Sequence, residues 1–245
     1  MTPRSLSPSV MTKTPIEARR VEEEPGFVLQ TYPWRETSLI VEALTRDYGR
    51  VSLVAKGAKR PASKFRGLLN PFSPLLFSFS GKSEVRTLTD VSWLGTLALT
   101  EGALMAAFYM NELVMRLTGR LDPNPALFAA YSRALKELAQ GANRTVVLRH
   151  FELDLLQAIG YGLPQSEFES DWYAYRSGDF LAVDSPNQNY GVPVRGATLR
   201  RMRAGMIDVG EEESEVRSLT REMIRYYLDG KQLNTRRIME EIRSL

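Results

Sequence analysis

The 245-residue sequence contains no cysteine and a single histidine, His150. The absence of thiols excludes disulfides, thiolate metal sites and a cysteine nucleophile, and it gives no reason to expect secretion. One imidazole cannot by itself supply a histidine metal cluster, nor is it enough for a Ser-His-Asp relay without suitable neighbours. His150 falls within a predicted helix, where a structural role is the better interpretation. The sequence therefore predicts no metal, no cofactor and no catalytic residue of these classes.

Long hydrophobic runs are also absent. No apolar stretch approaches the roughly 20 residues that a bilayer-spanning helix needs. Residues 1–24 mix serine, proline, threonine and charges without the apolar centre of a signal peptide, so they are predicted to be a disordered tail. We expect a cytoplasmic, nucleoid-associated protein that does not bind a membrane.

The net charge of +3 is small, but its distribution is uneven. Residues 25–90 carry ten Lys/Arg against five Asp/Glu, whereas residues 91–195 carry eight against eleven. Within the first segment, residues 56–66 place five cations in eleven positions without a carboxylate. Concentrated positive charge of this kind indicates a polyanion-binding module. A solvated loop without a binding role is the simpler alternative.

The candidate nucleic-acid-binding residues are the cations of this segment, an arginine group further along the chain and one aromatic. They are Arg35, Arg46, Arg50, Lys56, Lys59, Arg60, Lys64, Phe65, Arg66, Arg86, Arg200, Arg201 and Arg203. Trp34 and Phe65 are the best candidates for stacking on bases, although each could instead plug a barrel. The arginines at 200–203 could equally form the outer face of an amphipathic helix.

Short alternating segments separated by turn residues predict strands over residues 27–32, 38–44, 51–56, 75–80 and 85–89. Five short strands with a basic connecting loop favour an oligonucleotide/oligosaccharide-binding (OB) barrel over residues 25–95, although an SH3-like barrel would also fit. Pro33, which has no backbone N–H, is expected to end the first strand.

Residues 96–245 predict a mostly α-helical domain, so the fold class is a multidomain α+β protein. Helical spacing favours helices over residues 101–117, from 125 towards Gly141, over 145–159 with Asn143 as N-cap, and over about 214–229. Residues 165–195 are rich in Ser, Gly, Asp and Asn and are expected to be a loop-rich insert.

No enzymatic motif survives inspection. Gly81-Lys82-Ser83 resembles the end of a phosphate-binding loop, but Leu76 occupies the position of its first glycine, and a strand follows where a helix is required. Binding is therefore the favoured class of function, and we expect the chain not to be an enzyme. An RNA-binding OB protein serving translation or RNA processing is the main alternative. A DNA-dependent ATPase and a purely structural interaction protein rank below it.

Several motifs in consistent order resemble the RecO family of recombination mediators. They are Gly-Phe-Val-Leu at 26–29, Arg-Glu-Thr-Ser at 35–38, Thr-Arg-Asp-Tyr-Gly-Arg at 45–50, Ala-Lys-Gly-Ala-Lys-Arg at 55–60 and Leu-Leu-Asn-Pro-Phe at 68–72, followed by the turn at Gly81. Further matches are Leu-Arg-His-Phe-Glu-Leu-Asp-Leu-Leu at 148–156 with Gly-Tyr at 160–161, and Leu-Asp-Gly-Lys-Gln-Leu at 228–233 with Arg-Arg at 236–237. The resemblance covers about residues 25–245.

The resemblance implies an OB barrel joined to a helical domain. It also implies binding of single- and double-stranded DNA, annealing of complementary strands, and help in loading RecA onto DNA coated by the single-strand-binding protein SSB. The implied partners are RecR and the C-terminal tail of SSB, with RecA engaged indirectly. Many members carry four cysteines that form a zinc site after the Gly-Tyr pair. This sequence has none there, so no zinc site is expected and aromatic packing is the expected substitute.

Overall fold

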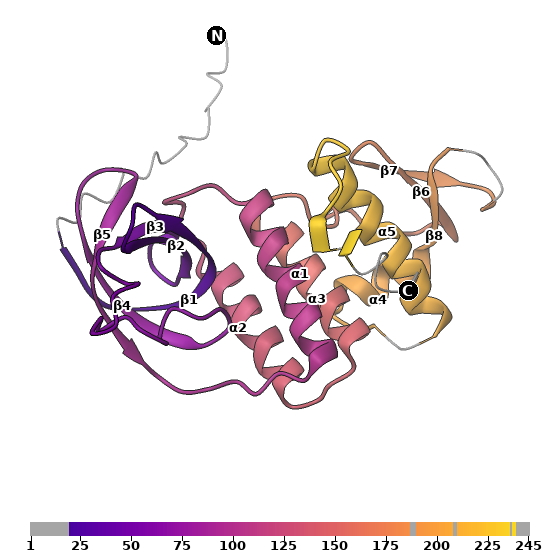
Figure 1. Cartoon of the computed structure of the whole chain (residues 1–245). Coiled ribbons are helices and arrows are strands. Elements are labelled where there is room, and N and C mark those ends of the chain that lie inside the picture. The colour runs from indigo at the N-terminus through magenta and orange to yellow at the C-terminus, as the bar shows by residue number, and fades with distance from the viewer. Residues whose placement is uncertain (1–19, 187–189, 208–209, 236, 239–245) are drawn as a thin grey trace, which may run out of the picture.

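A computed structural model describes residues 20–186, 190–207, 210–235 and 237–238 (Figure 1). Residues 1–19 of the predicted tail lie outside the described residues. The first five strands are β1 (Arg20–Trp34), β2 (Ser38–Thr45), β3 (Gly49–Ala55), β4 (Pro74–Ser80) and β5 (Val85–Trp93). The helical half contains α1 (Glu101–Leu117), α2 (Pro125–Ala139), α3 (Arg144–Ala158), β6 (Trp172–Arg176), β7 (Asp179–Val183), β8 (Val192–Arg195), α4 (Gly196–Arg203) and α5 (Glu211–Tyr227).

The five N-terminal strands close into a barrel of order β1-β2-β3-β5-β4, in which β4 pairs back to β1. The pairing of β3 with β5 is parallel, and the other barrel pairs are antiparallel. Side chains of β4 alternate between buried and half-buried positions, as expected for a strand with one face in a barrel core. The predicted five-stranded, OB-like barrel is confirmed.

Strand β1 is longer than the sequence predicts at both ends. It begins at Arg20, so residues 20–24, which the sequence places in the tail, pair with β4. Glu24 is buried there, and its carboxylate accepts a hydrogen bond of 2.6 Å from the backbone N–H of Asp47. The strand also continues through Pro33, contrary to the prediction. Pro33 is tolerated because pairing of β1 with β4 ends at Phe27, which leaves no strand on the far side of Pro33 to receive an N–H.

The helices agree closely with the predicted segments. Helix α1 spans the predicted residues, and Asn143 caps α3 by accepting bonds from the N–H groups of Thr145 and Val146. Asn124 caps α2 in the same way. Within the described ranges, no helix is both long and apolar enough to cross a bilayer.

The segment expected as a loop-rich insert contains β6, β7 and β8, which form a three-stranded antiparallel sheet of order β7-β6-β8. Each strand has only four or five residues, so none is long enough to show a clear alternation in the sequence. Tyr173 and Tyr175 are buried, and Phe168 packs edge-on against Tyr173 at 5.2 Å between ring centroids. Aromatic packing therefore holds this segment, as expected.

The barrel and the helical half share a hydrophobic core. Phe27 on β1 reaches the helices and meets the ring of Tyr131 on α2 at 5.3 Å between centroids. The side-chain amide of Asn111 on α1 donates to the backbone carbonyl of Leu29 at 2.7 Å. Figure 1 shows α1, α2 and α3 between the barrel and the small sheet, so the two ends of the molecule are well separated.

Candidate nucleic-acid interface

The basic loop, defined as residues 56–67, connects β3 towards β4 as a series of tight turns. Its backbone N–H groups donate to carbonyls three residues earlier, with N···O distances of 3.0 Å for Arg60 to Gly57, 3.0 Å for Ser63 to Arg60 and 3.1 Å for Arg66 to Ser63. Gly57 has a φ of 68°, in the left-handed region that favours glycine. The loop is therefore an ordered structure that fixes the places of its cations.

Apolar residues of the loop anchor it to the barrel. Ala58 and Phe65 belong to the barrel core, and both are buried. The backbone N–H of Lys59 donates to the carbonyl oxygen of Thr37 at 2.8 Å, which ties the loop to the turn between β1 and β2. Burial of the small and aromatic residues leaves the charged residues between them exposed. The pattern of apolar and basic residues in the loop thus orients the charge outwards.

A cavity of about 1020 Å³ opens between this turn, the start of the basic loop and the start of β5. Its lining residues combine cations, hydroxyl groups and apolar surface. They are Trp34, Arg35, Glu36, Thr37, Ser38, Val54, Lys56, Gly57, Arg60, Val85, Arg86 and Thr87. We call this cavity the cleft. A second hollow of about 440 Å³ is lined in part by Lys59, Phe65 and Arg66.

Five exposed cations line the cleft or the adjoining hollow: Arg35, Lys56 and Arg60 in the cleft, and Lys59 and Arg66 in the hollow. Within the described part of the chain, none of the five forms an ion pair. The guanidinium of Arg66 donates to the carbonyl oxygen of Pro61 at 3.1 Å. Glu36 contributes the single carboxylate to the cleft lining. The cleft therefore presents positive charge that neighbouring side chains leave largely unneutralised, which suits a phosphate backbone.

Arg86 lines the cleft from within the barrel wall and is only 5% exposed. Its guanidinium carbon lies 5.6 Å from the ring centroid of Phe79 and 5.9 Å from that of Tyr48. Burial lowers the pKa of Arg86, although arginine stays protonated at neutral pH. Arg86 adds positive charge behind the exposed cations, but its side chain is held by the barrel.

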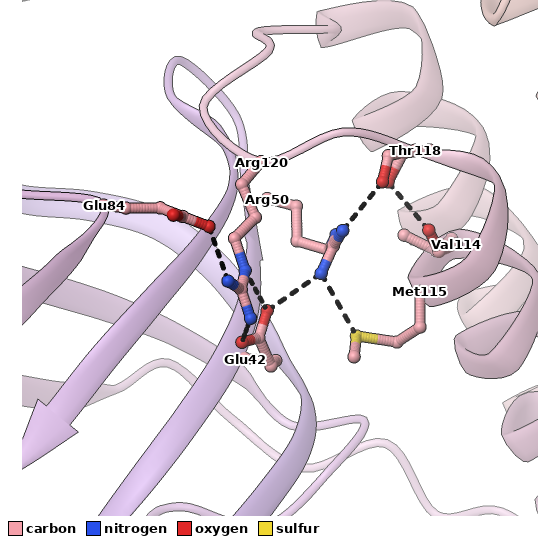
Figure 2. A network of polar contacts seen from close by, with 7 residues as sticks. All are labelled: Glu42, Arg50, Glu84, Val114, Met115, Thr118 and Arg120. Carbon is pink, nitrogen blue, oxygen red and sulfur yellow. Dashed lines mark hydrogen bonds and ion pairs between the residues drawn. The ribbon is translucent and has the colours of Figure 1, made fainter.

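Arg50, by contrast, belongs to a network that joins the barrel to the helical half (Figure 2). Its guanidinium donates to the Glu42 carboxylate at 3.0 Å and to the backbone carbonyl of Thr118 at 2.8 Å. Arg120 pairs with the same carboxylate at 2.6 Å and with Glu84 at 2.6 Å. These two carboxylates raise the pKa of Arg120. Arg50 is therefore engaged inside the protein and is removed from the candidate interface.

Glycine at position 49 allows this junction to close. Gly49 has a φ of 66°, and a Cβ built there would overlap the backbone carbonyl of Asp122. The neighbouring backbone N–H of Leu121 donates to the carbonyl oxygen of Arg50 at 2.8 Å. Sequence analysis missed Arg120 and Glu42 as members of the network, because Arg120 lies in the connection after α1, 78 positions from Glu42. No local pattern relates the two.

Two further cations that the sequence selected have acidic partners nearby. Arg46 lies in the turn between β2 and β3, at the opposite end of the barrel from the cleft, and pairs with Asp47 at 2.8 Å. Lys64 lies in the basic loop, but its ammonium contacts the carboxylate of Asp90 at 2.9 Å and the carbonyl oxygen of Thr89 at 2.6 Å. Both are exposed, yet each is partly neutralised.

The two aromatic candidates, Phe65 and Trp34, differ in how exposed their side chains are. Phe65 is 6% exposed and packs in the barrel core, which favours the barrel-plug alternative over stacking on a base. Trp34 is 43% exposed and lines the cleft.

The α4 arginines, defined as Arg200, Arg201 and Arg203, do not join the cleft. Figure 1 places α4 beyond the three central helices, on the side away from the barrel. Arg200 donates to the carbonyl oxygen of Phe168, and Arg201 pairs with Glu212 at 2.8 Å. Arg203 lies over the Phe168 ring at 4.6 Å from its centroid and donates to the carbonyl oxygen of Pro164 at 2.7 Å. These arginines fix the small sheet and its approach segment to α4.

The other motifs considered in the sequence form neither a metal site nor a phosphate-binding loop in the described part of the chain. Among residues 20–186, 190–207, 210–235 and 237–238, no group of three or more His, Asp or Glu side chains is placed to hold a metal ion. Gly81-Lys82-Ser83 forms the turn between β4 and β5, as the sequence predicts, and not a loop that opens a helix. The cleft is therefore the candidate functional site.

Comparison with known protein families matches both halves of the chain to one family. The family model for the N-terminal part of recombination protein O matches residues 20–97, and the model for its C-terminal part matches residues 102–237. The chain is 42% identical to "DNA repair protein RecO" of Aromatoleum aromaticum, over 94% of this chain and 99% of that protein. It is 44% identical to the protein of the same name from Azoarcus sp., over 93% of this chain and 98% of that protein.

Proposed function

The chain belongs to the RecO family of DNA repair proteins, and we propose that it is a DNA-binding recombination mediator without enzymatic activity. In this proposal it binds single- and double-stranded DNA, anneals complementary strands and helps to load RecA onto SSB-coated single strands. The exposed cations at the cleft are the observation that carries the proposal. The names of the relatives support DNA repair as the setting, and they do not favour the RNA-binding alternative.

Annealing needs no catalytic group, because the obstacle is electrostatic. Two single strands repel each other through their phosphates, and each phosphate contact with a lysine or arginine releases condensed counterions. The five exposed cations that line the cleft and the neighbouring hollow lower that repulsion where the strands meet. Base pairing then supplies the driving force for duplex formation.

Displacing SSB requires a second, protein-binding surface in addition to the cleft. We place the contact with the C-terminal tail of SSB on the helical half, and we propose RecR as the further partner. The work is expected to take place in the cytoplasm, at the nucleoid. No zinc or other cofactor enters this scheme, since the sequence has no cysteine to form a thiolate site.

Strand annealing on SSB-coated oligonucleotides tests the proposal. Complementary strands are coated with intact SSB or with SSB lacking its C-terminal tail, and duplex formation is followed after addition of the protein. We expect acceleration with intact SSB and a much smaller effect with the tail-deleted form. A protein that binds single strands but accelerates neither reaction would refute the mediator function and leave simple DNA binding.

Competition between matched DNA and RNA strands separates the proposal from its main alternative. Preferential retention of the DNA strand, together with co-purification of RecR and SSB, is the expected result. Preference for the RNA strand without capture of either protein would favour a role in RNA processing instead. A nucleotide-hydrolysis assay with and without DNA, expected to show no turnover, tests the absence of enzymatic activity.

A further inference from the structure

Trp34 is an exposed tryptophan at the edge of the barrel. It ends β1 at the mouth of the cleft, where its backbone pairs with Ser38 across the turn, and it remains 43% exposed. It belongs to neither hydrophobic core among the described residues. The barrel therefore does not use the indole for core packing, and the ring is available to a ligand in the cleft.

The backbone around Trp34 holds the ring at the cleft. Arg35, the next residue, has a φ of 52°, a left-handed conformation that non-glycine residues adopt uncommonly. This conformation forms the tight turn into β2, and the basic loop is bonded to that turn through Lys59 and Thr37. The guanidinium carbon of Arg35 lies 5.9 Å from the indole centroid. The ring and the exposed cations are thus fixed in one structure.

The chemistry of the cleft is mixed in a way that matches one kind of ligand. Trp34 and Val85 give it apolar surface, and Val85 is itself 38% exposed. Arg35, Lys56 and Arg60 give it positive charge. An unpaired nucleotide offers both a flat base and a phosphate, whereas a duplex presents phosphates and hides the faces of its bases.

We propose that Trp34 is a base-stacking residue that makes the cleft prefer unpaired nucleotides over duplex. This inference rests on the proposed DNA-binding function and specifies the form of the nucleic acid that the cleft takes. The cations would bind either form through phosphates, while the indole adds affinity for an open strand alone. Annealing benefits, because the finished duplex loses the stacking contact and is released.

The test compares strands that differ in their bases and share their phosphates. Oligo-dT and an abasic strand of equal length are titrated against the wild type and against Trp34→Ala. The wild type is expected to prefer oligo-dT, and Trp34→Ala to weaken oligo-dT binding by about tenfold while leaving the abasic strand unchanged. Trp34→Phe should recover part of the loss. Trp93→Ala is the matched control, since Trp93 is 57% exposed but does not line the cleft.

Fluorescence gives a second readout that a folding defect does not imitate. The sequence has three tryptophans, so Trp93→Phe with Trp172→Phe leaves Trp34 as the sole indole. We expect oligo-dT to quench its emission strongly and the abasic strand to leave it nearly unchanged. Equal loss of affinity for both strands in Trp34→Ala, or no loss for either, would overturn the stacking inference and leave DNA binding intact. Failure of the wild type to bind any strand would overturn the DNA-binding function itself, and the stacking inference with it.

Discussion

The basic loop of the barrel and the α4 arginines are two clusters of cations that differ in what surrounds them. In the loop, Lys56, Lys59 and Arg60 are exposed and form no ion pair within the described part of the chain. The α4 arginines instead reach backbone carbonyls, a carboxylate and an aromatic ring of their own domain. Clustered positive charge is therefore available for a ligand only where the fold places acceptors out of reach.

Loss of the carboxylate that pairs with Arg50 and Arg120 should give the largest effect on stability. Glu42, 1% exposed, is the shared partner of Arg50 and Arg120. Glu42→Ala removes the carboxylate and leaves the mostly buried Arg50 without its counter-charge, so we expect the free energy of unfolding to fall by about 3 kcal/mol. Urea denaturation followed by circular dichroism measures the change.

Glu84→Ala is the matched control for this prediction. Glu84 pairs with the same Arg120 at 2.6 Å, but its side chain is 64% exposed. An ion pair in water contributes little, so the loss of unfolding free energy should stay below about 1 kcal/mol. Equal losses in the two variants would show that burial does not decide the strength of these pairs, and the distinction between the two classes of cation would lose its physical basis.

Removal of the exposed cations of the basic loop should give the largest effect on DNA affinity. Changing Lys56, Lys59 and Arg60 together to alanine should remove three of the proposed phosphate contacts. At about 0.7 unit of salt slope per contact, affinity for a single strand near 0.1 M salt should fall by about 100-fold. The slope of log K against log salt, expected at about −2 to −3.5 for the wild type, should become shallower by about 2. Fluorescence anisotropy at several salt concentrations measures both quantities.

The double change of Arg200 and Arg203 to alanine provides the comparison within the same chain. Since both arginines are engaged with Phe168 and its neighbours, we expect affinity for a single strand to change by less than about twofold. A large loss of affinity here, with an intact fold, would place part of the interface on the helical half and contradict the comparison.

Much of the fold could be predicted from the sequence, because local rules decide it. Helix α1 was predicted over its full length from the spacing of apolar residues, and Asn143 was identified as the cap of α3. Turn residues marked the connections between the barrel strands. The β6–β8 sheet was missed, because its strands are too short for an alternation to stand out. A strand of four or five residues contains too few positions for its alternation to be distinguished from that of a loop.

The candidate site was predictable only in part, for a different reason. The sequence shows the basic loop as a dense group of cations, and five exposed cations line the cleft and its neighbouring hollow in the structure. Whether an arginine is free depends on partners far away in the chain. Arg50 meets Thr118 across 68 positions, and Arg200 meets Phe168 across 32. The burial of Phe65 could not be predicted, because the sequence does not show which side of a turn faces the core.

A smaller effect on stability is expected at α4. Arg203→Ala removes the cation over the Phe168 ring and its bonds to the carbonyls of Pro164 and Ser166. Partial exposure of this side chain limits the cost, and we expect a loss of about 1 kcal/mol, or a melting temperature about 2–4 °C lower. Arg203→Lys should restore little, because an ammonium lacks the planar guanidinium that lies over the Phe168 ring. Arg60→Ala, which changes an exposed arginine of the basic loop, should leave the melting temperature unchanged.

The smallest effect on DNA affinity is expected at Lys64. This residue lies in the basic loop, but it forms an ion pair with Asp90 as the cations outside the cleft do with their partners. Its ammonium lies 2.9 Å from Asp90 and lowers the pKa of that carboxyl below its ordinary value of 3.8. A lowered carboxyl pKa stabilises the fold above pH 3.8, and this contribution is lost as the pH falls through the folded-state pKa. Lys64→Ala should raise the pKa of Asp90 towards its ordinary value in an NMR titration, while single-strand affinity falls by less than about twofold. If Lys64→Ala costs as much affinity as Lys59→Ala, an existing ion pair does not withhold a cation from DNA, and exposure alone separates the basic loop from α4.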